Sequence, residues 1–131
     1  MRMLGIDYGT KKIGLALSDE RGRFASPYSV IATNQKTLKT VVAICHQEEI
    51  TKIVIGKSLN YEGTPNAVQA EAEKFAKTLG EATGLPIAFE LEVLTTKEAE
   101  RDIGRDELTD ARAAALILKS YIDRQQNDGN K

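Results

Sequence analysis

Three carboxylates stand at points of the chain where folding could bring them together: Asp7, Glu92 and Asp110. Asp7 ends an apolar run, and a charge in that position is costly to bury unless it is paired or holds a metal. Three converging carboxylates would repel one another unless cations lay between them, which favours one or two Mg²⁺ or Mn²⁺ ions. A pair of such ions can activate water and stabilise the leaving oxygen in phosphodiester cleavage. The pattern therefore predicts a nuclease site.

Each carboxylate also has a simpler interpretation. Asp7 could accept hydrogen bonds from the turn amides of Gly9 and Thr10 and do nothing else. Glu92 could face solvent, and Asp110 in the first turn of a helix would be stabilised by the helix dipole without any metal. Spacing alone leaves both interpretations open.

The elements that would position these residues follow from the hydrophobic periodicity. Apolar runs and alternating patterns predict five strands, at residues 3–7, 13–18, 28–31, 52–56 and 87–94. Apolar residues at helical spacing predict helices over 37–49 and 109–123, with a third that Thr64 caps and Gly84 stops. A capping-box spacing predicts a short extra helix over 95–104. The order βββαβαβα predicts an α/β fold, a mixed five-stranded sheet with helices on both faces.

This order also says where the carboxylates should lie. The first strand and the strand after the first helix are expected near the centre of the sheet, with their C-terminal ends at its crevice. Asp7 lies at one such end and Glu92 ends a later strand. Asp110 begins a helix that could pack back across the sheet toward them.

Length and charge narrow the function classes. A chain of 131 residues fits one domain, expected over 1–123 with a polar tail over 124–131 that should fray. The 18 basic and 19 acidic residues give a net charge of -1, so bulk charge does not indicate a nucleic-acid binder. Attraction for phosphates would have to come from bound cations or from a local patch, for which Lys11, Lys12 and Lys57, all expected in loops, are the candidates.

Membrane and secretory classes are not indicated. No apolar run approaches the roughly 18 residues of a membrane span, and the first 17 residues lack the apolar core of a signal peptide. The only cysteine, Cys45, cannot form an internal disulfide and lies on the apolar stripe of its helix, so it is expected in the core. A lone cysteine fits a reducing cytoplasm.

Four segments, taken in order, resemble the signatures of one nuclease family: Asp7–Asp19, Ile55–Gly63, Leu94–Ala99 and Asp110–Ala114. The first is similar to the opening signature of the YqgF family of RNase H-like nucleases, which includes Holliday junction resolvases and pre-16S rRNA nucleases. The others resemble its glycine-leucine-proline-leucine-asparagine loop, its threonine-rich motif and its last-helix motif. The resemblance extends from Met3 to Asp123.

This resemblance implies an RNase H-like fold and a two-metal nuclease site. It assigns the catalytic and metal-binding roles to Asp7, Glu92 and Asp110, and it places Asn60 in a loop that contacts substrate. Two features depart from the family pattern. Leu91 and Val93 stand where the family usually has an aspartate and an arginine, and the segment 104–109 is short and mostly acidic where the family's is longer and basic.

The function expected from residues and resemblance together is a metal-dependent endonuclease acting on structured nucleic acid, most simply in 5′-end maturation of pre-16S rRNA. DNA four-way junctions are the alternative substrate. Junction resolution would require a dimer because two opposed strands are cut, whereas RNA trimming could be done by a monomer.

Two other classes stay open at this point. The departures at Leu91 and Val93 would fit a degenerate module that binds nucleic acid or protein without catalysis. The Asp7-x-Gly9-Thr10 turn also resembles the phosphate loop of actin-like ATPases and sugar kinases. Those proteins clamp nucleotide between two such domains, and this chain provides one.

Overall fold

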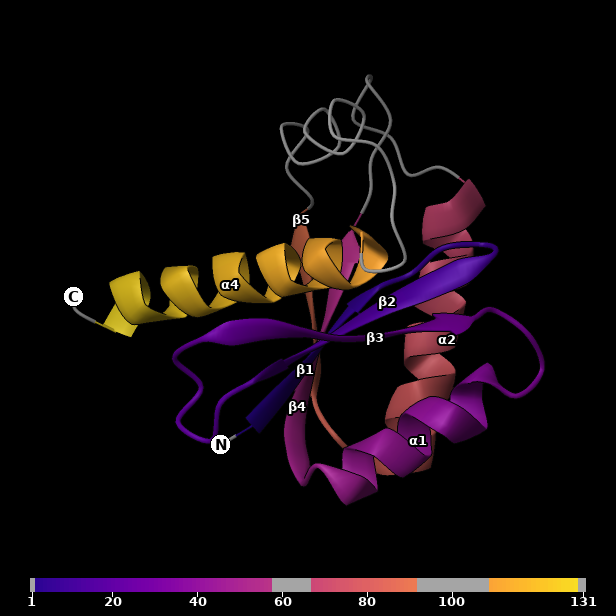
Figure 1. Cartoon of the computed structure of the whole chain (residues 1–131), viewed down its shortest axis with the longest axis horizontal. Coiled ribbons are helices and arrows are strands. Elements are labelled where there is room, and N and C mark those ends of the chain that lie inside the picture. The colour runs from indigo at the N-terminus through magenta and orange to yellow at the C-terminus, as the bar shows by residue number, and fades with distance from the viewer. Residues whose placement is uncertain (1, 58–66, 92–108, 130–131) are drawn as a thin grey trace.

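The computed structural model describes residues 2–57, 67–91 and 109–129, which form five strands and three helices (Figure 1). The strands are β1 (Arg2–Asp7), β2 (Lys12–Ser18), β3 (Ala25–Ala32), β4 (Ile50–Lys57) and β5 (Ile87–Leu91). The helices are α1 (Thr37–Gln47), α2 (Ala67–Thr83) and α4 (Thr109–Gly129). The predicted α/β order is confirmed. The Thr64 cap and the short helix predicted over 95–104 lie outside the described residues.

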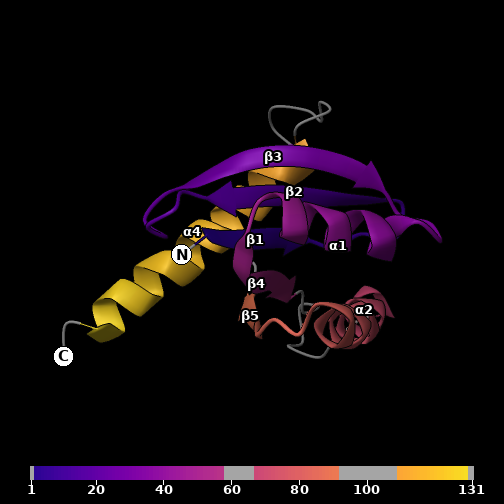
Figure 2. The same cartoon turned by 90° about the horizontal axis from the view of Figure 1, so that it is seen from below.

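The strands form one mixed sheet in the order β3-β2-β1-β4-β5, with β1 at its centre. β1 to β3 are antiparallel neighbours, whereas β4 runs parallel to both β1 and β5. Helix α4 covers one face of the sheet, and α1 and α2 cover the other (Figure 2). The carboxyl ends of β1, β4 and β5 therefore meet at one edge, as the chain order predicted.

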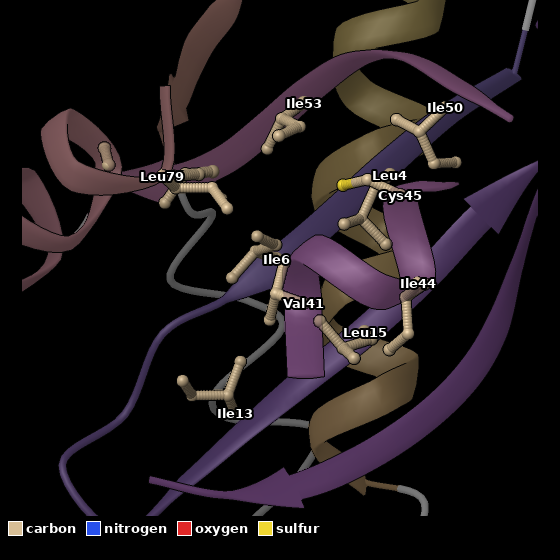
Figure 3. Packing of buried hydrophobic residues seen from close by; sticks show 12 residues of the cluster. Leu4, Ile6, Ile13, Leu15, Val41, Ile44, Cys45, Ile50, Ile53 and Leu79 are labelled. Atoms are coloured by element: carbon tan, nitrogen blue, oxygen red, sulfur yellow. The ribbon is translucent and has the colours of Figure 1, made fainter. Parts of the chain in front are cut away.

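Alternation along β1 divides its side chains between the two faces. Leu4 and Ile6 pack in the cluster formed with α1 and α2 (Figure 3). Met3 packs instead with residues of α4. Asp7 has the parity of Met3, so its side chain belongs to the α4 face of the sheet.

Cys45 lies in the larger core cluster, 5% exposed, as predicted from its helical stripe (Figure 3). Burial raises the pKa of its thiol from 9.0 to about 11. Only the thiolate is nucleophilic, so the thiol should react slowly at neutral pH.

We expect Cys45 to react with Ellman's reagent at pH 8 about 100-fold more slowly than an exposed cysteine, because two pKa units reduce the thiolate fraction by that factor. Absorbance at 412 nm follows the reaction. Full-rate labelling should appear only in denaturant, with one thiol per chain. Rapid labelling of the native protein would contradict the burial of this side chain.

Two boundaries differ from the sequence expectation. The third strand starts at Ala25 and includes Pro27, although proline lacks a donor for sheet pairing. It is tolerated because β3 is an edge strand and the pairing shifts register at this point. The chain beyond Arg124 was expected to fray, but α4 continues through Gly129. The Arg124 guanidinium binds the Glu90 carboxylate of β5 at 2.6 Å, which anchors this part of the helix to the sheet.

Candidate nuclease site

Asp7 and Asp110 are brought together through a glycine that lies between them. Asp7 is the last residue of β1, and its cross-strand partner in β2 is Gly14. The Cα atoms of such partners lie about 4.5–5.5 Å apart. A Cβ atom on Gly14 would overlap the backbone carbonyl of Asp110, so the first turn of α4 rests directly on Gly14. Asp7 and Asp110, each half-buried, thus belong to the same face and edge of the sheet.

A second close approach fixes the direction of α4 over β1. A Cβ atom on Gly5 would stand 2.9 Å from the Leu118 Cβ and 3.0 Å from the Ala114 carbonyl oxygen. Asp110, Ala114 and Leu118 are spaced by four residues and so lie along one side of the helix. Gly5 and Asp7 lie along one side of β1, and this matching periodicity sets the Asp110 end of α4 beside Asp7.

Tyr8 points to the opposite face from Asp7. Its ring lies against Phe75 of α2, with centroids 5.4 Å apart. Burial, and then the Glu71 carboxylate, raise the pKa of the Tyr8 hydroxyl. The phenol therefore stays protonated at neutral pH, and it anchors the chain directly after Asp7 to α2.

Three of the four candidate phosphate ligands belong to the described residues, and they lie near this edge of the sheet. Lys11 and Lys12 are exposed where the chain passes from β1 into β2. Lys57 is the last residue of β4 and not part of a loop as expected, so it ends the strand next to β1 at the same edge. Asn60 and Glu92 lie outside the described residues.

Glu90 is a further carboxylate on the α4 face of the sheet. It is the last but one residue of β5, and its side chain is 12% exposed. Its partner Arg124 is 54% exposed. The nearly buried Glu90 carboxylate forms an ion pair with Arg124, so we interpret it as a structural anchor for α4 and not as a metal ligand.

Replacing Arg124 by Leu is expected to lower the free energy of unfolding by about 1–3 kcal/mol, because the Glu90 carboxylate would lose its charged partner while staying largely buried. Urea denaturation measures the change. The double variant Glu90→Gln/Arg124→Leu should recover part of the loss. If the two single changes add without coupling, the pair contributes nothing to stability.

The donor set available for a metal consists of carboxylate oxygens. Among the residues that the structure describes, no three His, Cys, Asp or Glu side chains gather as a metal site. Two of the three predicted ligands, Asp7 and Asp110, are within this part and stand at one edge. Hard oxygen donors of this kind suit Mg²⁺ or Mn²⁺ and not a softer metal.

Gly14 supports the candidate site, and the carboxylate pattern did not single it out. The signal was in the sequence: a glycine inside an apolar strand marks a place where another backbone approaches closely. Which backbone approaches could not be read from the strand, because Asp110 is 96 residues further along the chain.

Comparison with known families matches the chain to the family model described as RuvX, Holliday junction resolvase, over residues 1–124. This chain belongs to that family. The predicted YqgF assignment is thereby confirmed, and so is the prediction of a hydrolase that acts on phosphodiester bonds. Membership of a nuclease family disfavours the alternative of an ATP-dependent phosphate loop.

Curated relatives match over nearly their whole length. A protein of Syntrophomonas wolfei is 38% identical over 94% of this chain and 94% of its own length. One of Thermoanaerobacter pseudethanolicus is 36% identical over 97% of this chain and 99% of its own length. Both carry the name "putative pre-16S rRNA nuclease".

Solved structures confirm the RNase H-like fold. Thermus thermophilus RuvC in complex with a Holliday junction substrate has a TM-score of 0.65 at 16% identity, covering 97% of this chain and 96% of that one. The fowlpox virus Holliday junction resolvase has a TM-score of 0.58 at 13% identity, with coverage of 95% and 99%.

In the part of the chain that the structure describes, no helix has the length and apolar character needed to span a membrane.

Proposed function

We propose that this protein is a divalent-metal-dependent endonuclease that matures the 5′ end of pre-16S rRNA. The observation that carries the proposal is that Gly14, the cross-strand partner of Asp7, lies directly under the backbone of Asp110 in the first turn of α4. They stand at the edge where the parallel strands end, which is where α/β sheets bind their ligands. The RNA substrate is inferred from the names of relatives that are 36% to 38% identical over nearly full length.

The site is proposed to hold two Mg²⁺ or Mn²⁺ ions, as nucleases of this family generally use divalent metals. Asp7 and Asp110 would bind them, with Glu92, the residue after the last described residue of β5, as the third carboxylate. The chemistry such bound ions supply is an activated water and stabilisation of the charge on the leaving oxygen. The protein's own contribution would be to hold Asp110 near Asp7 through the packing of α4 on β1 and β2.

Substrate binding is proposed to rest on Lys11, Lys12 and Lys57, with Asn60 as a further contact. Lys11 and Lys12 directly follow the strand that carries Asp7, and both are exposed to solvent. Lysine side chains beside the proposed site would attract phosphate groups locally. The net charge of the chain, -1, provides no such attraction. The protein is proposed to work in the cytoplasm, as a monomer or a homodimer.

A second candidate substrate is a DNA four-way junction. The family description and the fold shared with junction resolvases favour it. Resolution would require two active sites on opposed strands and hence a homodimer.

A side-by-side cleavage assay separates these possibilities. Purified protein is incubated with a pre-16S rRNA 5′ fragment or with a synthetic four-way DNA junction, in Mg²⁺, in Mn²⁺ or in EDTA. We expect metal-dependent cutting of the RNA fragment at a defined site and little cutting of the junction. Preferential cutting of the junction would transfer the proposal to the second substrate. Binding of both substrates without any cutting would identify a catalytically degenerate module. The presence of Val93 where the family usually has an arginine favours this alternative.

A further inference from the structure

The turn that follows Asp7 is held by a residue from another part of the chain. Thr33, directly after β3, makes two hydrogen bonds to this turn. Its hydroxyl donates to the Gly9 carbonyl oxygen at 2.7 Å. Its backbone N–H donates to the Lys11 carbonyl oxygen at 3.0 Å. One residue thus binds both sides of the turn between Asp7 and Lys12.

Thr33 is itself immobilised by the start of α1. The buried Thr37 hydroxyl donates to the Ala32 carbonyl at 2.9 Å and accepts the Asn34 N–H at 2.8 Å. The Asn34 side chain accepts the Lys36 N–H at 2.8 Å. Residues on both sides of Thr33 are therefore tied into a hydrogen-bonded connection, which makes Thr33 a rigid anchor and not a flexible loop contact.

The turn leaves little room for another shape. A Cβ atom on Gly9 would stand 2.5 Å from the Lys12 carbonyl oxygen, so the backbone closes tightly at this glycine. Tyr8 is fixed on the other side against Phe75 of α2. The Thr33 hydroxyl donates its hydrogen bond to a backbone carbonyl within this closed turn.

We propose that Thr33 is a positioning residue for substrate: it holds the turn so that Lys11 and Lys12 meet the phosphates of the nucleic acid. This inference rests on the proposed nuclease function. Because Thr33 bonds to the carbonyls of Gly9 and Lys11, it acts on the lysine turn and not on the metal ligands. Its loss should weaken substrate binding and leave the rate of the bound complex nearly unchanged.

The test compares Thr33→Val, Thr33→Ser and a matched control, Thr51→Val. Thr51 also donates its hydroxyl to a backbone carbonyl, that of Arg2 at 3.3 Å, but at the opposite end of β1. Cleavage of the pre-16S rRNA fragment gives KM and kcat for each variant. Hydrogen exchange without substrate reports the mobility of residues 8–12. Thermal unfolding shows whether each variant remains folded.

For Thr33→Val we expect KM to rise about two- to tenfold, the range that one hydrogen bond contributes, with kcat changed less than twofold. Exchange across residues 8–12 should become faster. Thr33→Ser should have the wild-type KM and the wild-type exchange rate because it keeps the hydroxyl. Thr51→Val should also match the wild type in KM and in exchange across residues 8–12.

Unchanged KM and exchange in Thr33→Val would overturn the inference, as would a fall in kcat at constant KM, which would place the effect on the metal ligands. An equal rise of KM in Thr51→Val would show that the effect of Thr33→Val on KM is a general consequence of lower stability, which would also overturn the inference. If the wild type neither binds nor cuts the RNA, the proposed function fails instead, and the exchange data alone then decide whether Thr33 holds the turn.

Discussion

Asp7→Asn is expected to reduce cleavage of the pre-16S rRNA fragment to below about one-hundredth of the wild-type rate. Residues that merely support a metal ligand are worth about 10- to 100-fold, and a lost ligand should cost more. The fold should survive, because asparagine has nearly the same shape and one of two neighbouring negative charges is removed. The free energy of unfolding without metal should therefore be equal to that of the wild type or slightly higher.

The metal dependence of stability gives a second measurement. Millimolar Mg²⁺ or Mn²⁺ should raise the melting temperature of the wild type, because an ion that binds only the folded state stabilises it. Asp7→Asn should show little of this rise. The matched control is Asp123→Asn, which removes the same charge from an exposed position on α4 and should leave cleavage and metal stabilisation unchanged. Undiminished cleavage by Asp7→Asn would point to a contaminating nuclease and sink the assignment.

Gly14→Ala is expected to damage stability and activity together. The added Cβ would overlap the Asp110 carbonyl, so the first turn of α4 must move away from the sheet. Overpacking of this kind costs about 1–3 kcal/mol, and contact with backbone leaves little possibility of relief by rotation of a side chain. Displacement of Asp110 from Asp7 should also weaken stabilisation by Mg²⁺ and reduce cleavage, as measured by urea denaturation and by the RNA assay.

Gly80→Ala in α2 serves as the control. Its Cβ would stand 3.3 Å from the flexible end of Ile87, and α2 should gain about 0.5–1 kcal/mol because alanine favours the helix. This variant is expected to be at least as stable as the wild type, with unchanged cleavage. A Gly14→Ala protein that keeps full stability and full Mg²⁺ response would show that α4 does not depend on this close approach.

Local pattern was sufficient for much of the fold. The apolar runs around Asp7 and Ile53, and the alternation after Pro86, predicted strands where the structure has β1, β4 and β5. The stripe that includes Cys45 predicted α1 and its buried face. These features depend on residues a few positions apart, which is why periodicity can report them.

Where local pattern was insufficient, a distant residue made the difference. The polar end of the last helix looked ready to fray, but Arg124 reaches Glu90 of β5 and the helix continues to Gly129. Thr33 showed no signal of its own, because its importance comes from the carbonyls of Gly9 and Lys11 that fold against it.

The sequence by itself determined that Asp7 ends a buried strand and that Asp110 opens an amphipathic helix. Only the tertiary structure decided that these two carboxylates share one edge, because the position of a helix on a sheet depends on where backbones can approach each other. Gly5 and Gly14 permit that approach along α4, and they set Asp110 beside the strand that carries Asp7. The residue types thus indicated the chemistry. The assembly of the site depended on two glycines, which have no side chain to keep the helix away from the sheet.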